Sequence, residues 1–124
     1  MRFMLKTLLL LGSCFLFMAC PQKDDGYACT EEFIYGLSIS LSDSVTGEFI
    51  TEDVTIEISD GDFSEELMTF PESTSFFGAG ERPGNYTISV IAEGYQEFIS
   101  APIEVNANEC HVIPESRTFE LQPI

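Results

Sequence analysis

Cysteine and histidine are the residue types that most often ligate metals or attack substrates, and this chain of 124 residues holds four cysteines and one histidine. The cysteines are Cys14, Cys20, Cys29 and Cys110, and His111 directly follows the last of them. A structural zinc site needs four ligands, and Cys29 and Cys110 have no companions at ligand spacing. A catalytic triad would depend on His111 alone. We therefore expect no metal, no cofactor and no catalytic residue, with His111 in a packing or loop role.

The first two cysteines lie in or directly after an apolar segment at the start of the chain. Arg2 and Lys6 supply positive charge, and residues 7–19 carry none. That stretch is too short for a transmembrane helix, which takes about 20 apolar residues. It has the length of the apolar region of a signal peptide. We predict that residues 1–19 are a cleaved signal peptide, which removes Cys14.

Ala19 directly before Cys20 resembles the lipobox of bacterial lipoproteins, in which the cysteine is diacylglycerated and becomes the new N-terminus. Phe17 and Met18 depart from the preferred leucine and small residue, as is common in Bacteroidetes. The alternative is an ordinary secretory signal followed by a coincidental cysteine. The resemblance implies a lipid on Cys20, and two or three acyl chains anchor a protein stably to a membrane. The expected location is the outer membrane, on its cell-surface or periplasmic face.

Residues 20–31 form the expected tether between the lipid and a folded domain. Within it, Lys23, Asp24 and Asp25 resemble the export signal that sends some Bacteroidetes lipoproteins to the outer face of the outer membrane. A solvated tether without a sorting role explains these three residues equally well.

The two remaining cysteines, Cys29 and Cys110, lie near the two ends of the predicted domain. Thiols outside the cytosol usually pair, so we predict a disulfide between them. In the chain-entropy view, closing a loop of about 80 residues stabilises the fold by roughly 4 kcal/mol.

Acidic residues dominate the charge of the mature chain. Lys23, Arg82 and Arg117 stand against 21 acids, which leaves a formal charge of −18. Nucleic acids and anionic lipids require positive potential and are excluded as expected partners. The acidity is typical of solubility and spacing from an anionic surface, with cation binding as the alternative. Asp60 and Asp62 flank a hairpin glycine, but their spacing does not match an EF-hand, and a solvated hairpin is favoured over a weak calcium site.

Residues 32–124 show the period-two alternation of half-buried strands. Turn residues separate the apolar runs at intervals of about ten, and no window has a helical period. The expected strands include 37–41, 54–58, 63–70, 76–80, 86–90, 98–105 and 118–121. Pro102 suggests an edge strand or a bulge. This pattern predicts an all-β fold, an antiparallel β-sandwich of about seven strands that is prealbumin-like or immunoglobulin-like.

Two motifs of this domain resemble the carboxypeptidase regulatory-like family. The first is Asp43-Ser-Val-Thr-Gly47, and the second is Pro83-Gly-Asn-Tyr-Thr-Ile-Ser-Val90 with Gly94-Tyr95 after it. The resemblance covers about residues 33–121. It implies a prealbumin-like (transthyretin-like) sandwich with a non-catalytic accessory, adhesive or carbohydrate-adjacent role. It implies no particular ligand, because a fold does not determine a function.

Some side chains are candidates for contact with other molecules. Phe76 and Phe77 are adjacent in an expected strand, so one of them must face away from the core, and Tyr95 lies at a turn. These rings could grip a sugar or peptide, although a second buried cluster under a loop is the favoured explanation. The segment Asp43-Ser44-Val45 resembles the Bacteroidetes O-glycosylation motif, which makes Ser44 a candidate modification site.

The sequence thus predicts a non-enzymatic, membrane-anchored lipoprotein whose β-sandwich is an interaction module for an unknown protein or glycan. The alternative is a structural subunit of an envelope assembly. An interaction module should show an exposed apolar patch, and a structural subunit an unpaired sheet edge. An enzyme should show a cleft with polar groups around His111.

Overall fold

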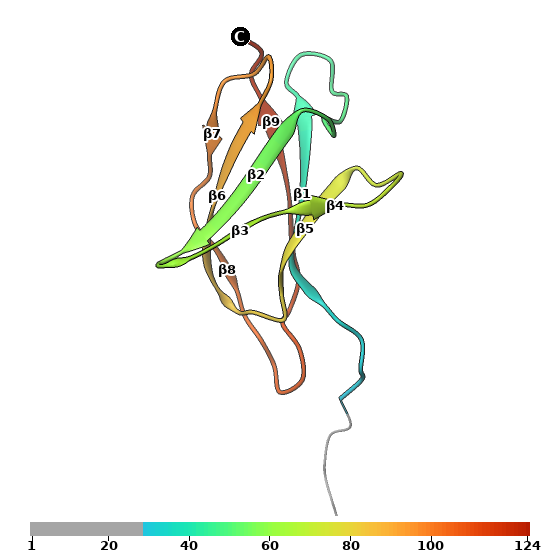
Figure 1. The fold of residues 1–124 in the computed structure, drawn as a ribbon, viewed down its shortest axis with the longest axis vertical. Coiled ribbons are helices and arrows are strands. Elements are labelled where there is room, and N and C mark those ends of the chain that lie inside the picture. The colour runs from blue at the N-terminus through green and yellow to red at the C-terminus, as the bar shows by residue number, and fades with distance from the viewer. Residues whose placement is uncertain (1–28) are drawn as a thin grey trace, which may run out of the picture.

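The structure, a computed structural model, describes residues 29–124, which fold into two β-sheets packed face to face (Figure 1). The predicted signal peptide, Cys20 and the triplet Lys23-Asp24-Asp25 lie outside the described residues. The strands are β1 (Tyr35–Asp43), β2 (Val54–Asp60), β3 (Phe63–Glu66), β4 (Met68–Thr69), β5 (Ser75–Gly80), β6 (Gly84–Ala92), β7 (Phe98–Ile99), β8 (Ile103–Val105) and β9 (Glu115–Leu121). The predicted all-β sandwich is confirmed. No helix in this part of the chain is long and apolar enough to cross a membrane.

The first and last strands lie side by side in the same sheet. One sheet has the order β4-β5-β1-β9, and the other has the order β3-β2-β6-β7, with β8 also paired to β6. Every pairing between these strands is antiparallel except that of β1 with β9, which runs parallel from Leu37 opposite Glu115 to Asp43 opposite Leu121. Because β1 lies between β5 and β9, both of its edges are paired.

One continuous cluster of buried side chains fills the space between the sheets. It follows the alternation seen in the sequence and includes Leu37, Ile39 and Leu41 of β1, Ile56 and Ile58 of β2, and Tyr86, Ile88 and Val90 of β6. The Tyr86 ring is fully buried, and its hydroxyl donates to the carbonyl of Arg82 at 2.6 Å, which satisfies its polar end. Residues 29–124 therefore bury a continuous core.

The stretch 63–70, predicted as one strand, is two strands in different sheets. β3 ends at Glu66 and β4 begins at Met68, and Leu67 between them is buried between the layers. A Cβ at Gly78 would collide with the Leu67 side chain. The glycine on β5 therefore leaves the space into which Leu67 turns as the chain changes sheets.

The stretch 98–105 is also broken where a single strand was predicted. β7 ends before Ser100, and β8 begins after Pro102. The Ser100 backbone N–H donates to the carbonyl of Ile88 at 2.9 Å, and its hydroxyl accepts the Ile88 N–H at 3.0 Å. The hydroxyl of Ser100 thus takes the place of a backbone acceptor for the Ile88 N–H at the break between β7 and β8. This break lies at the edge of the sheet, next to Pro102, for which the sequence suggested an edge strand or a bulge.

Candidate functional site

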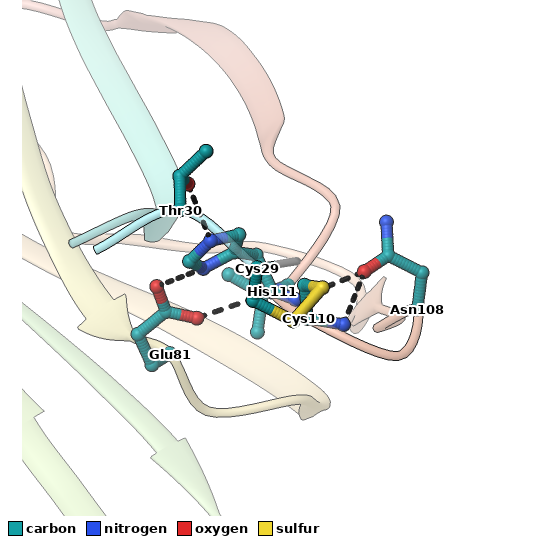
Figure 2. Close-up of a disulfide and its surroundings, with 7 residues drawn as sticks. Cys29, Thr30, Glu81, Asn108, Cys110 and His111 are labelled. Carbon is teal, nitrogen blue, oxygen red and sulfur yellow. Dashed lines mark hydrogen bonds and ion pairs between the residues drawn. A yellow bond between two sulfur atoms is a disulfide. The ribbon is translucent and has the colours of Figure 1, made fainter. Parts of the chain in front are cut away.

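Cys29 and Cys110 form a disulfide, as the sequence predicts, with their Cα atoms 5.3 Å apart and a sequence separation of 81. Cys29 is the first described residue, and Cys110 lies in the loop between β8 and β9 (Figure 2). The side chain of Asn108 accepts the backbone N–H of Cys110 at 2.8 Å and that of His111 at 2.9 Å. The bond therefore ties the entering chain to an ordered loop.

A chain of side-chain hydrogen bonds lies beside the disulfide (Figure 2). A carboxylate oxygen of Glu81 is 2.7 Å from Nδ1 of His111, and Nε2 of His111 is 2.9 Å from the hydroxyl of Thr30. Glu81 also accepts the backbone N–H groups of Ile34 at 2.9 Å and Val112 at 3.3 Å. One carboxylate therefore links the entering chain, the turn between β5 and β6, and the loop between β8 and β9.

The Glu81 carboxyl is held in its ionised form. Burial opposes its ionisation, but the N–H of Ile34, then His111 and the N–H of Val112 outweigh that effect and hold its pKa below the ordinary value. Glu81 has a φ of 49°, in the left-handed region that non-glycine residues adopt at a cost. In this backbone conformation the Glu81 carboxylate lies within hydrogen-bond distance of three groups: the N–H of Ile34, the ring of His111 and the N–H of Val112.

Glu81, His111 and Thr30 follow the acid, imidazole and hydroxyl order of a hydrolase triad. Acyl transfer also needs free backbone donors for the developing oxyanion. Here the N–H groups of Cys110 and His111 are both taken by Asn108. His111 also lines none of three surface hollows of about 310 to 360 Å³ in the described part of the chain. This geometry favours a bracing role for His111.

At the other end of β1, Asp43 closes the turn that carries the first family-like motif. Its carboxylate accepts the backbone N–H groups of Val45 at 2.7 Å and Thr46 at 2.9 Å and the hydroxyl of Tyr95 at 2.7 Å. The Tyr95 hydrogen bond is the largest cause of a lowered pKa at Asp43, and the same bond raises the pKa of Tyr95. Gly47, with a φ of 80°, lets the chain complete this turn. Tyr95 is therefore engaged within the domain.

Ser44 is half-buried in the same turn, and its modification stays a prediction. Its backbone N–H donates to the carbonyl of Leu121 at 3.0 Å, and its hydroxyl lies 3.1 Å from the side-chain oxygen of Gln122.

Asp60, weighed above as a weak calcium ligand, pairs instead with Arg82 at 3.2 Å. Among residues 29–124, no group of three or more His, Cys, Asp or Glu side chains is arranged to hold a metal ion.

Apolar side chains gather outside the core, where β1, β4 and β5 lie side by side. Phe76 is buried and Phe77 points to the opposite face, as their adjacency requires. Phe77 lies 5.7 Å from Tyr35 and 5.6 Å from Phe70, measured between ring centroids, and Phe33 lies 5.2 Å from Tyr35. Met68 is the cross-strand partner of Phe77. We call this group the aromatic surface: Phe33, Tyr35, Met68, Phe70 and Phe77.

The aromatic surface is substantially open to solvent. Phe33 is 62% exposed, Met68 50% and Phe70 45%. A groove of about 360 Å³ opens beside it, lined by Phe33, Tyr35, Phe63, Glu65, Met68, Ala79, Gly80 and Arg82. A Cβ at Gly80 would collide with the Phe33 ring, so glycine at this position allows the ring to lie against the strand.

Both charged side chains of the groove already have partners in the domain. The Arg82 guanidinium stacks over the Phe63 ring at 3.8 Å, and its Nη1 donates to Asp60 and to the hydroxyl of Tyr86. Glu65 accepts the backbone N–H of Ala79 at 2.9 Å. The remaining lining is aromatic or aliphatic apart from the Tyr35 hydroxyl, so the groove offers apolar contact above all.

Sequence reasoning missed most of this surface. The spacing of Phe33 and Tyr35, two residues apart at the start of a strand, was a usable signal for a shared face. Phe70 gave no such signal, because it joins the surface only through the sheet change at Leu67. Glu81 gave no such signal either, since its three partners come from distant segments.

No protein-family model matches this chain, and no curated protein matches it.

Proposed function

We propose that this chain is a lipid-anchored protein of the bacterial envelope whose β-sandwich is a non-catalytic interaction module. The aromatic surface is the observation that carries this proposal, because three of its members are 45% to 62% exposed and lie together. Contiguous apolar patches on soluble domains mark interaction sites. Phenylalanine, tyrosine, methionine and arginine, the residue types here, are enriched in protein interfaces.

The anchoring part of the proposal rests on the signal peptide pattern and on Cys20. Cys29 follows Cys20 by nine positions, and an extended chain spans at most about 3.3–3.6 Å per residue. A lipid on Cys20 would thus keep the sandwich within about 30 Å of the membrane. The triplet Lys23-Asp24-Asp25 supports the outer face as its position.

The proposal includes membership of the carboxypeptidase regulatory-like family, with its prealbumin-like arrangement. Asp43 belongs to the first motif and Tyr95 to the second, and the two side chains meet in a hydrogen bond of 2.7 Å. This contact gives the two motifs a joint structural role, which supports their origin in one family pattern. Ser44, half-buried beside Asp43, is the proposed site of O-glycosylation on the strength of its sequence motif.

Labelling in the source bacterium with an alkyne analogue of palmitate tests the anchor. We expect the wild-type protein to be labelled and Cys20→Ser to be unlabelled, and an unlabelled wild type would contradict the proposal.

Protease shaving of intact cells, with a periplasmic protein as control, then tests the membrane face. Loss of the domain while the control survives is the expected result, and protection would overturn the role assigned to Lys23, Asp24 and Asp25.

A structural subunit is the second candidate, and β9 favours it. Among the described residues β9 pairs only with β1, so its outer edge can accept a further strand. A photo-crosslinking residue in place of Thr118 on β9 or of Phe70 on the aromatic surface separates the candidates. Crosslinks in cells from position 70 support the interaction module, whereas one abundant partner captured from position 118 supports the structural subunit.

The non-catalytic part of the proposal has its own test at the triad-like side chains. We expect hydrolysis of p-nitrophenyl acetate by the wild-type protein to equal that by Thr30→Ala. A wild-type rate well above that of the variant would make Thr30 a nucleophile and contradict the proposal.

A further inference from the structure

The charge around the aromatic surface has one sign. Exposed glutamates flank its members along the chain: Glu31 and Glu32 directly precede Phe33, Glu66 stands two residues before Met68, and Glu72 two residues after Phe70. The described residues hold 19 acids and only two arginines. The arginine at the groove, Arg82, is already paired with Asp60. The potential over this surface is therefore negative, and it attracts cationic partners.

The shape of the aromatic surface disfavours a sugar as its occupant. A pyranose ring stacks on a flat aromatic platform, but the neighbouring rings here are tilted by 38° to 84° relative to one another. A sugar also needs convergent polar groups, and both Glu65 and Arg82 are engaged within the domain. Tilted rings beside a groove of about 360 Å³ suit apolar side chains, which pack at many angles.

We infer that the aromatic surface binds a cationic polypeptide segment, whose apolar side chains enter the groove while its basic side chains face the surrounding glutamates. The inference rests on the proposed function and names the chemistry of its partner. Charge complementarity speeds and orients the encounter, and the aromatic anchors supply most of the affinity. The same division of roles explains why an acidic domain keeps Phe33 and Phe70 exposed.

The test uses residues 21–124, which include every residue of the buried cluster, with the Cys29–Cys110 disulfide intact. The probe is a 12-residue peptide of alternating lysine and leucine, and the comparator is hexalysine, which has the same number of basic side chains. We expect the lysine–leucine peptide to bind at least ~10-fold more tightly than hexalysine, because the apolar anchors dominate affinity. We also expect it to shift the NMR amide signals of Tyr35, Phe77 and Gly80 in the wild-type protein.

Surface variants locate the anchors. Phe33→Ser and Phe70→Ser should each weaken binding of the lysine–leucine peptide by ~10-fold or more, whereas Phe70→Trp should retain it. Phe49→Ser is the matched control, since Phe49 is 53% exposed but lies near Tyr95, away from the groove. The NMR map on the wild-type protein does not depend on how the variants fold.

Equal affinity for the two peptides, with shifts spread over the acidic loops, would overturn the inference by showing attraction through charge alone. Binding to phosphatidylcholine vesicles or to cellohexaose without binding to the lysine–leucine peptide would overturn it too, in favour of a membrane or a glycan. If these assays fail while crosslinks from position 70 are found in cells, the partner chemistry is wrong and the interaction module stands.

Discussion

At each end of β1 a carboxylate accepts hydrogen bonds from neighbouring segments, but only one end also has a disulfide. At the entry end, Glu81 accepts two backbone N–H groups and contacts His111. At the far end, Asp43 accepts two backbone N–H groups and the Tyr95 hydroxyl. At the far end, an ionised carboxylate and the backbone bonds around it close the sandwich without a disulfide. The entry end, where the described chain begins, has a disulfide in addition.

The disulfide and the carboxylates stabilise the fold through different states of the chain. A disulfide stabilises chiefly by restricting the unfolded chain, whatever the pH. A carboxylate that accepts several hydrogen bonds stabilises only the folded state, and only while it is ionised. The entry end therefore combines a covalent link that is insensitive to acid with a carboxylate that is sensitive, whereas the far end has the carboxylate and no covalent link.

Removal of the disulfide is the largest expected change. The double variant Cys29→Ala/Cys110→Ala should lower the free energy of unfolding by about 4 kcal/mol, because the unfolded chain regains the freedom of a loop of about 80 residues. Urea denaturation at neutral pH measures this difference, and reduction of the wild-type protein should reproduce it. A loss below about 1 kcal/mol would show that the entry end, like the far end, holds without a disulfide.

Loss of the far-end carboxylate is the next largest change. Asp43→Ala removes the acceptor for Val45, Thr46 and Tyr95 at once and should lower Tm on the order of 5 °C. Thermal unfolding followed by circular dichroism measures the shift. Asp62→Ala is the matched control, since Asp62 is exposed in the hairpin between β2 and β3. Equal shifts in the two variants would mean that Asp43 does not close the far end.

These two ends also show how far the sequence could be interpreted. The far end was partly predictable, because Asp43, Gly47 and Tyr95 sit in local motifs whose turn chemistry depends on neighbouring residues. The disulfide was predictable by elimination, because the predicted signal peptide and lipid site account for Cys14 and Cys20 and leave one pair of cysteines. Glu81 was not predictable, since its donors come from Ile34, His111 and Val112, and only the folded chain brings them together.

The strands likewise divide into those that the local sequence predicts and those whose position depends on residues distant in sequence. Alternation predicted β1, β2 and β6, because their inward residues repeat every second position. The stretch 63–70 was predicted as one strand, yet the chain changes sheets at Leu67, which depends on the space left by Gly78 on another strand. The aromatic surface was missed for this reason, because that sheet change brings Met68 and Phe70 beside Phe77.

Acid should remove the far-end contribution and spare the disulfide. The pKa values of Asp43 and Glu81 are both lowered, so the folded state binds fewer protons than the unfolded state in the acid range. Their stabilisation is fully present above the unfolded carboxyl pKa of about 4 and is lost as pH falls through the folded value. The difference in unfolding free energy between wild type and Asp43→Ala should therefore be constant from neutral pH to about pH 5 and then shrink. Urea denaturation over a pH series measures it, and a difference unchanged at about pH 2 would contradict the role of the ionised carboxylate.

The smallest expected change isolates the contact between the two family-like motifs. Tyr95→Phe removes one hydroxyl, so Tm should fall by only a few degrees, while the pKa of Asp43 should rise toward its ordinary value because the Tyr95 hydrogen bond is the largest cause of its lowering. The rise should be incomplete, since the N–H groups of Val45 and Thr46 still donate to the carboxylate. NMR titration of the Asp43 carboxyl carbon measures it directly. An unchanged pKa would mean that the turn alone holds the far end and that the two motifs are not coupled through this pair.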